Sequence, residues 1–145
     1  MILTDEAGTE ALGSRLASLL RPGDVVTLSG PLGAGKTALA RAVLHAAGHR
    51  GEVPSPTFAI VQPYDELDPP IWHCDLYRLE DPAELEELGL DMVLGEGALL
   101  VEWPERAGEA AWPEALRLRL DVRDDGSRAL TWIVPAAWKG RWPPA

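Results

Sequence analysis

The sequence predicts an α/β fold with a central, mostly parallel sheet, helices on both faces and an antiparallel C-terminal edge. Three observations lead to this prediction. Strand-like and helical patterns alternate along residues 5–88. Residues 98–101 form a continuous apolar run, as in a strand that is buried on both faces of a parallel sheet. Near the C-terminus, the strand-like segments 116–122 and 129–134 are separated by a short turn, which indicates a hairpin.

The N-terminal third is predicted to hold two helices around one buried strand. The elements are, in order, a helix over 5–20, a turn over 21–24, a strand over 25–28 and a helix over 36–47. Leucines recur at helical spacing in the first helix, and Thr4 or Asp5 can cap its start. Gly48 follows the second helix and is the type of residue that ends helices.

The middle of the chain is richer in proline. Here we expect a strand over 58–61, an acidic loop over 65–70, a strand over 71–77 and a helix over 81–88. Residues 54–57, Pro-Ser-Pro-Thr, cannot be helical, because two prolines fix φ and restrict the residues before them. The helix signal is Asp81 as N-cap with Pro82 and Glu84 in the first turn, and Gly89 is its stop.

The C-terminal part is predicted to complete the sheet. The strict alternation of residues 116–122 indicates a half-exposed strand, and Asp-Asp-Gly at 124–126 is a turn sequence before the last strand. The tail, residues 139–145, carries no interpretable pattern. Because the chain has 145 residues and no evident linker, we expect residues 1–145 to form a single domain.

Residues 30–37, with the sequence GPLGAGKT, match the phosphate-binding P-loop pattern G-x-x-x-x-G-K-[ST]. They follow a predicted strand and open a predicted helix, which is the context that the motif requires. Its glycines let the backbone approach a phosphate, and the N–H groups of the loop and helix start form an anion nest. Lys36 can reach the β- and γ-phosphates, and Thr37 can bind Mg²⁺. The sequence therefore predicts a P-loop NTPase fold that binds a nucleoside triphosphate with Mg²⁺.

Such a site needs a carboxylate at the end of a neighbouring buried strand. Glu102 follows the apolar run 98–101 and is our first choice as the second Mg²⁺ ligand with Thr37. Asp75 is the alternative, and it could instead orient the attacking water. Thr57 resembles the γ-phosphate sensor of a GTPase switch, although it could simply belong to a turn. His73 could bind substrate, orient a carboxylate or be an ordinary packed histidine.

Composition narrows the possible partners. The formal net charge of −10 argues against nucleic-acid binding by this chain alone, because such binding depends on neutralising phosphates. The single cysteine excludes an internal disulfide and fits a reducing compartment. The N-terminus is acidic where a secretory leader would be basic, and no apolar stretch approaches the length of a membrane span. We therefore expect a cytoplasmic protein without membrane contact.

The order of the motifs is more specific than any one of them. After the P-loop come Ser-Pro-Thr-Phe at 55–58, His-Cys-Asp-Leu-Tyr-Arg-Leu at 73–79 and Val-Glu-Trp-Pro at 101–104. In this order the strings resemble the signature of the TsaE (YjeE) family, the bacterial ATPases of tRNA threonylcarbamoyladenosine biosynthesis. The resemblance covers almost the whole chain. Cys74 stands where that family usually has phenylalanine, an apolar-for-apolar exchange.

The resemblance implies a small ATPase with a weak basal rate, a hydrolase that works with the TsaB and TsaD proteins. TsaD would carry out the transfer to tRNA, so this chain would be a regulator or reset motor that meets tRNA only through the complex. The resemblance implies ATP and Mg²⁺ as cofactors. The residues themselves make Lys36, Asp75 and Thr57 our candidate catalytic residues. The implied Mg²⁺ ligands are Thr37 and Glu102. The implied nucleotide-binding residues are Leu32, Gly33, Ala34, Gly35, Lys36, Thr37, Trp103, Glu6 and Arg128.

Two other functions use the same cradle. A small-molecule kinase would need a lid and an acceptor-binding segment, for which only residues 50–70 are available. An ATP-sensing interaction module would bind the nucleotide without needing turnover. A GTPase is disfavoured because the chain has no asparagine and hence no N-K-x-D guanine reader. The absence of this reader points toward adenine as the base.

Overall fold

The computed structural model describes residues 1–53, 61–108 and 110–143. Its elements are β1 (Ile2–Leu3), α1 (Glu6–Leu19), β2 (Val25–Ser29), α2 (Lys36–Ala46), β3 (Val61–Tyr64), β4 (Ile71–Asp75), α3 (Glu84–Glu87), α4 (Leu90–Val93), β5 (Ala98–Glu102), the 3₁₀ helix η1 (Pro104–Ala107), β6 (Leu116–Val122), β7 (Arg128–Ile133) and the 3₁₀ helix η2 (Ala136–Trp138). No helix in these ranges is long and apolar enough to cross a bilayer.

The strands form one sheet in the order β1-β7-β6-β2-β5-β4-β3. The four inner strands β6, β2, β5 and β4 are parallel, and the outer strands pair antiparallel at both edges. The carboxyl ends of β2, β5 and β4 therefore lie at one edge of the sheet. In open α/β sheets, ligands bind outside this edge.

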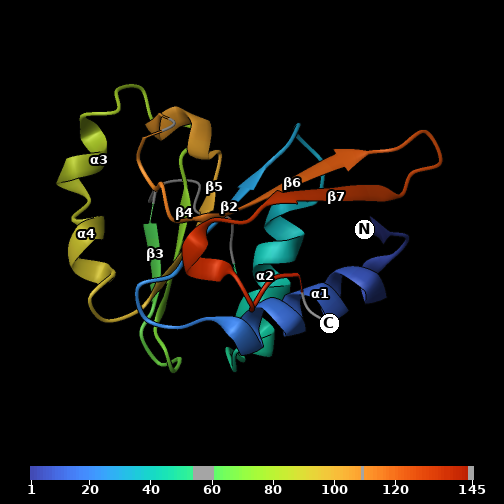
Figure 1. Ribbon diagram of the computed structural model, residues 1–145, viewed down its shortest axis with the longest axis horizontal. Helices are drawn as coiled ribbons and strands as arrows, with labels where there is room; N and C mark the ends of the chain where they lie inside the picture. The colour runs from blue at the N-terminus through green and yellow to red at the C-terminus, as the bar shows by residue number, and fades with distance from the viewer. Residues whose placement is uncertain (54–60, 109, 144–145) are drawn as a thin grey trace.

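Helices cover both faces of the sheet (Figure 1). α1 and α2 pack on one face together with η2, whereas α3, α4 and η1 pack on the other. Successive residues of β5 feed the two cores, since Leu100 belongs to the α1/α2 side and Leu99 and Val101 belong to the opposite side. This explains why residues 98–101 are apolar without alternation.

Several sequence expectations are confirmed at their local signals. Asp5 is the N-cap of α1, and its side chain accepts a hydrogen bond of 2.9 Å from the Gly8 N–H. β6 and β7 form the predicted antiparallel hairpin, and the Asp125 carboxylate accepts the Ser127 N–H in its turn. Gly89 has a φ of 65° and separates α3 from α4.

Other expectations were wrong at the boundaries. The helix expected over 81–88 is regular only over α3, although Asp81 does accept a hydrogen bond from the Ala83 N–H. The strand expected over 71–77 ends at Asp75, because the Asp75 carboxylate accepts the Tyr77 N–H and turns the chain. Residues 58–60 of the strand expected over 58–61 lie outside the described residues. β3 continues through Pro63, which an edge strand tolerates.

The tail that had no predicted structure is tied to the fold. Trp142 of the tail, and Trp138 directly before the tail, are buried in the α1/α2 core. Arg141 makes a bidentate ion pair with Asp24, with N–O distances of 2.7 and 2.9 Å, and donates to the carbonyl of Leu19 at 2.9 Å. The tail therefore joins the end of α1 to the start of β2.

Candidate functional site

The P-loop connects the central strand β2 to α2. Gly30, Gly33 and Gly35 have φ values of 135°, 78° and 100°, which residues other than glycine rarely adopt. A Cβ on Gly33 would meet nothing within 4 Å, so the loop borders open space there. The backbone can therefore present its N–H groups and the start of α2 to an anion.

Lys36 is buried at the first position of α2. Its Nζ donates to the carbonyl oxygens of Gly30 at 2.6 Å and Pro31 at 2.8 Å, and lies 4.2 Å from the centre of the Trp103 ring. Burial lowers the pKa of Lys36, while the carboxylates of Glu102, Glu105 and Asp75 oppose this shift. These contacts hold the ammonium group at the mouth of the loop.

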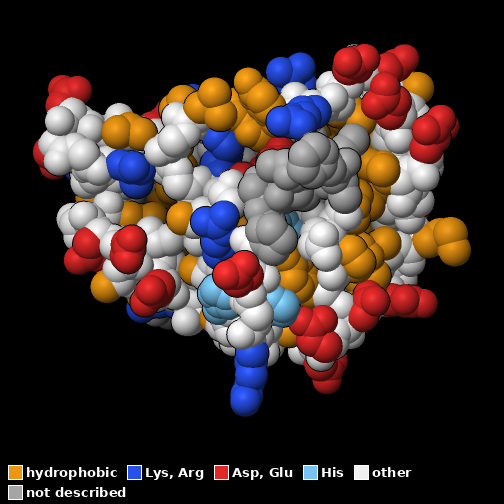
Figure 2. Space-filling view, turned by 180° about the vertical axis from the view of Figure 1, so that it is seen from behind, with side chains coloured by type: hydrophobic (Ala, Val, Ile, Leu, Met, Phe, Trp, Pro, Cys, Tyr) orange, Lys and Arg blue, Asp and Glu red, His pale blue; other side chains and the backbone are white. Residues whose placement is uncertain are grey.

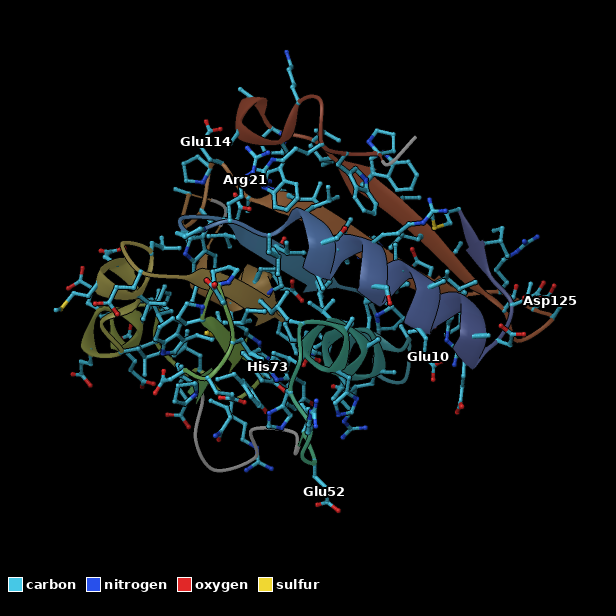
Figure 3. The ribbon with its side chains drawn as sticks, turned by 90° about the horizontal axis from the view of Figure 1, so that it is seen from below. Glu10, Arg21, Glu52, His73, Glu114 and Asp125 are labelled. Carbon is cyan, nitrogen blue, oxygen red and sulfur yellow. The ribbon has the colours of Figure 1, made fainter. Side chains whose placement is uncertain are left out.

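Glu102, the last residue of β5, is the point where three elements meet. Its Oε1 accepts a hydrogen bond of 2.8 Å from Thr37 Oγ1 on α2. Its Oε2 lies 2.6 Å from Nε2 of His73 on β4. Glu102 is 1% exposed and His73 is fully buried. In Figure 3, His73 lies in the interior beside α2, whereas Glu10, Glu52 and Asp125 project from the surface. The fold thus brings the side chains of Thr37 and Glu102 into direct contact.

Asp75 lies opposite Glu102 in the β4–β5 register. Burial raises the pKa of Asp75, the Tyr77 N–H bond to its carboxylate lowers it, and the nearby Glu102 charge raises it. Its charge also acts on Lys36. Asp75 is therefore a half-buried carboxylate with a raised pKa, but the hydroxyl of Thr37 bonds to Glu102.

Trp103 follows Glu102 directly and has an unusual backbone conformation. Its φ of 58° and ψ of 50° place it in the left-handed region, which is costly for a bulky residue. Its N–H donates to the Leu28 carbonyl at 3.2 Å, and its ring packs against Tyr77 with centroids 4.9 Å apart. This conformation carries the indole over Lys36.

Arg128, at the start of β7, contacts the backbone of the P-loop. Its Nε donates to the Ala34 carbonyl at 3.0 Å and its Nη2 to the Gly33 carbonyl at 3.3 Å. Leu3 lies opposite Arg128 in the sheet, so α1 begins close to this corner, and Glu6 is exposed in its first turn. Sequence reasoning did not foresee that Arg128 grips loop carbonyls, since these residues are more than 90 positions apart.

Thr57 and Leu32 complete the expected site residues. Thr57 lies outside the described residues. Leu32 is 70% exposed at the tip of the loop. Sequence reasoning also missed the contact between Lys36 and the Trp103 ring, for which no local pattern exists.

Known proteins share both the sequence and the fold. The family model "Threonylcarbamoyl adenosine biosynthesis protein TsaE" matches residues 3–130. A relative from Streptomyces coelicolor, named tRNA threonylcarbamoyladenosine biosynthesis protein TsaE, is 49% identical over 76% of this chain and 76% of its own. The protein of the same name from Bacillus subtilis is 39% identical over 87% of this chain and 79% of its own. The crystal structure of Bacillus subtilis YdiB superposes with a TM-score of 0.80 and 30% identity, covering 94% of this chain and 85% of that one. The chain therefore belongs to the TsaE family of threonylcarbamoyl adenosine biosynthesis proteins.

Proposed function

We propose that residues 1–145 form one P-loop ATPase domain that depends on Mg²⁺ and acts with TsaB and TsaD in threonylcarbamoyladenosine modification of tRNA. The hydrogen bond of 2.8 Å between Thr37 Oγ1 and Glu102 Oε1 carries this proposal, because it joins the loop hydroxyl to a buried strand-end carboxylate. P-loop NTPases hold Mg²⁺ with these two kinds of oxygen. The printed names of the relatives support the tRNA pathway.

The residues present fit a nucleoside triphosphate with Mg²⁺. The positive φ angles of Gly33 and Gly35 and the start of α2 suit the phosphate cradle that we assign to residues 32–37. Thr37 and Glu102 offer the oxygen donors that Mg²⁺ prefers. When bound, Mg²⁺ would neutralise the negative charge that develops on the phosphate oxygens.

The remaining residues receive roles that follow from their positions. Lys36 supplies a buried positive charge at the mouth of the loop. Asp75, with its raised pKa, is proposed to orient the attacking water. Trp103 would lie against the nucleotide, and Arg128 and Glu6 would flank it at the β1–β7 corner. Thr57 remains our proposed γ-phosphate sensor.

The acidic surface of the chain favours protein partners over direct contact with tRNA. Figure 2 shows acidic side chains gathered where α3 and α4 lie, and the chain has a net charge of −10. A surface of this sign repels phosphate backbones, so we propose that tRNA is met only through the complex, in the cytoplasm. The absence of asparagine excludes the guanine reader N-K-x-D and favours ATP over GTP.

The decisive experiment compares Glu102→Gln with the wild-type chain. Both carboxylate oxygens of Glu102 are engaged inside the fold, so the amide keeps the shape but loses the charge. We expect Mg²⁺-dependent ATP hydrolysis to fall at least about 100-fold while Mg²⁺-free nucleotide binding persists. Glu87→Gln, an exposed substitution on α3, is the matched control and should hydrolyse ATP normally.

Adding the TsaB–TsaD pair tests the pathway. We expect stimulated ATP hydrolysis with release of inorganic phosphate. A phosphorylated nucleoside or metabolite would instead identify a small-molecule kinase. Intact tRNA modification by Glu102→Gln would favour an ATP-sensing module. If the TsaB–TsaD pair neither stimulates ATP hydrolysis nor co-elutes with this chain, the proposed partnership is refuted.

A further inference from the structure

The contact between His73 and Glu102 has no role in the assignments above. His73 is fully buried, and its Nε2 lies 2.6 Å from Glu102 Oε2. Its other ring nitrogen, Nδ1, is buried without a hydrogen-bond partner among the described residues. The contact with Glu102 is therefore the one polar interaction that the His73 ring makes among the described residues.

The contact requires a definite protonation of the ring. A carboxylate oxygen accepts hydrogen bonds, so Nε2 must carry the proton that is shared with Glu102. Nδ1 has no acceptor among the described residues to which it could donate. A proton on Nε2, shared with Glu102, leaves no N–H of the ring buried without an acceptor, which would be costly in the interior.

The β4–β5 register explains how the contact arises. His73 pairs with Leu100, and side chains alternate between faces along a strand, so Leu100 and Glu102 point the same way. His73 thus faces Glu102 diagonally, on the side of the sheet that α2 covers. On this side Thr37 binds Oε1 of the same carboxylate. The two oxygens of Glu102 are thereby divided between two donors from two different elements.

We propose that His73 is a positioning residue for Glu102: its Nε2–H holds Oε2 and so fixes Oε1 toward the hydroxyl of Thr37. His73 itself touches neither the loop nor Thr37 in the described contacts. The orientation of the Glu102 carboxylate by His73 follows from the geometry alone. The consequence for metal binding rests on the proposed function. Without this donor, Oε2 would be buried without a partner, and the carboxylate would turn away from its productive orientation.

Two variants separate positioning from packing. His73→Gln places an amide N–H near the position of Nε2, whereas His73→Leu fills similar space without a donor. The readout is Mn²⁺ binding in the presence of ADP, measured by electron paramagnetic resonance, alongside ADP binding without metal. Loss of a residue that orients a metal ligand lowers metal affinity about 10–100-fold. We therefore expect His73→Leu to bind Mn²⁺ at least about 10-fold more weakly, with Mg²⁺-free ADP binding unchanged, and His73→Gln to stay within about 3-fold of wild type.

Equal losses in the two variants would overturn the proposal, because packing alone would then explain them. Normal Mn²⁺ binding by His73→Leu would overturn it as well. If the wild-type chain binds ADP and Mn²⁺ only independently of each other, the proposed function fails, and with it the metal part of this inference.

A measurement on the wild-type chain tests the geometry even where a variant does not fold. Long-range ¹H–¹⁵N correlation spectra report which ring nitrogen carries the proton, and the chain has only three histidines to assign. We expect the proton of His73 on Nε2, with or without nucleotide. A proton on Nδ1 with a bare Nε2 would refute the hydrogen bond to Glu102.

Discussion

Gly13→Ala in α1 should destabilise the protein, although alanine is normally the better helix former. An alanine in place of a helical glycine gains about 1 kcal/mol from helix propensity alone. At Gly13, however, the added Cβ would lie 2.5 Å from Ala42 Cβ, 2.7 Å from Ala42 C and 2.9 Å from Val43 N. Two of these three atoms belong to the backbone of α2, so no side-chain rotation can relieve the overlap.

The size of the effect follows from the distances. Ordinary contact begins near 3.4 Å, so α1 would have to move by almost 1 Å from α2. Overpacking of this kind typically costs about 1–3 kcal/mol. With the cost near the upper end, because backbone blocks the new atom, the net loss after the propensity gain is about 2 kcal/mol. For a chain of this size this corresponds to a Tm lower by about 4–8 °C.

The same helix provides the control. A Cβ on Gly8 would meet its nearest neighbours, in Asp5 and Leu3, at 3.6 and 3.7 Å, which is ordinary contact. Gly8→Ala should therefore raise the free energy of unfolding by about 0.5–1 kcal/mol. Thermal and denaturant unfolding of both variants measures the contrast. If Gly13→Ala proves as stable as Gly8→Ala, the close approach of α1 and α2 does not exist in solution.

Three further predictions concern other parts of the fold. The hydrogen bond to the Glu66 carboxylate raises the pKa of His49 above its ordinary value of 6.5. The stability lost in His49→Gln should therefore be largest below pH 6.5 and should vanish as pH rises through the higher pKa of the folded state. A difference in urea unfolding that does not change with pH would refute this. Burial raises the pKa of Asp75, so Asp75→Asn should increase Tm while it slows ATP hydrolysis; a lower Tm at neutral pH would contradict the cause given for the shift. Arg141→Met leaves the Asp24 carboxylate without its bidentate partner and should cost about 3 kcal/mol in calorimetry, and a loss below about 1 kcal/mol would mean that the pair is effectively solvated.

The features that the sequence predicted well depend on residues close together in the chain. The P-loop requires glycines at fixed spacing before Lys36 and Thr37, and its backbone angles follow from that spacing. The N-cap at Asp5 acts on an N–H three residues away. The turn of the β6–β7 hairpin is likewise local. Each of these interactions joins residues within a few positions of each other, so the local sequence carries its signal.

The features that were missed or left open depend on contacts between segments that are far apart in the chain. β1 has only two residues, and pairing with β7 defines it as a strand. The tail had no pattern, because Trp142, like Trp138 directly before the tail, is buried in a core whose helices are far away in sequence. The grip of Arg128 on the P-loop spans 94 residues. No local propensity carries information about such contacts.

The candidate site also combines features that the local sequence predicted with contacts that only the folded chain creates. By itself, the sequence determined the P-loop with its lysine and threonine, and it offered two candidate acids at strand ends. Only the tertiary structure decided that Glu102, and not Asp75, accepts the hydroxyl of Thr37, and that His73 holds the other oxygen of that carboxylate. The physical reason is that a hydrogen bond depends on fractions of an ångström between elements, and these distances follow from the parallel register of β4 and β5 and from the seat of α2 against them.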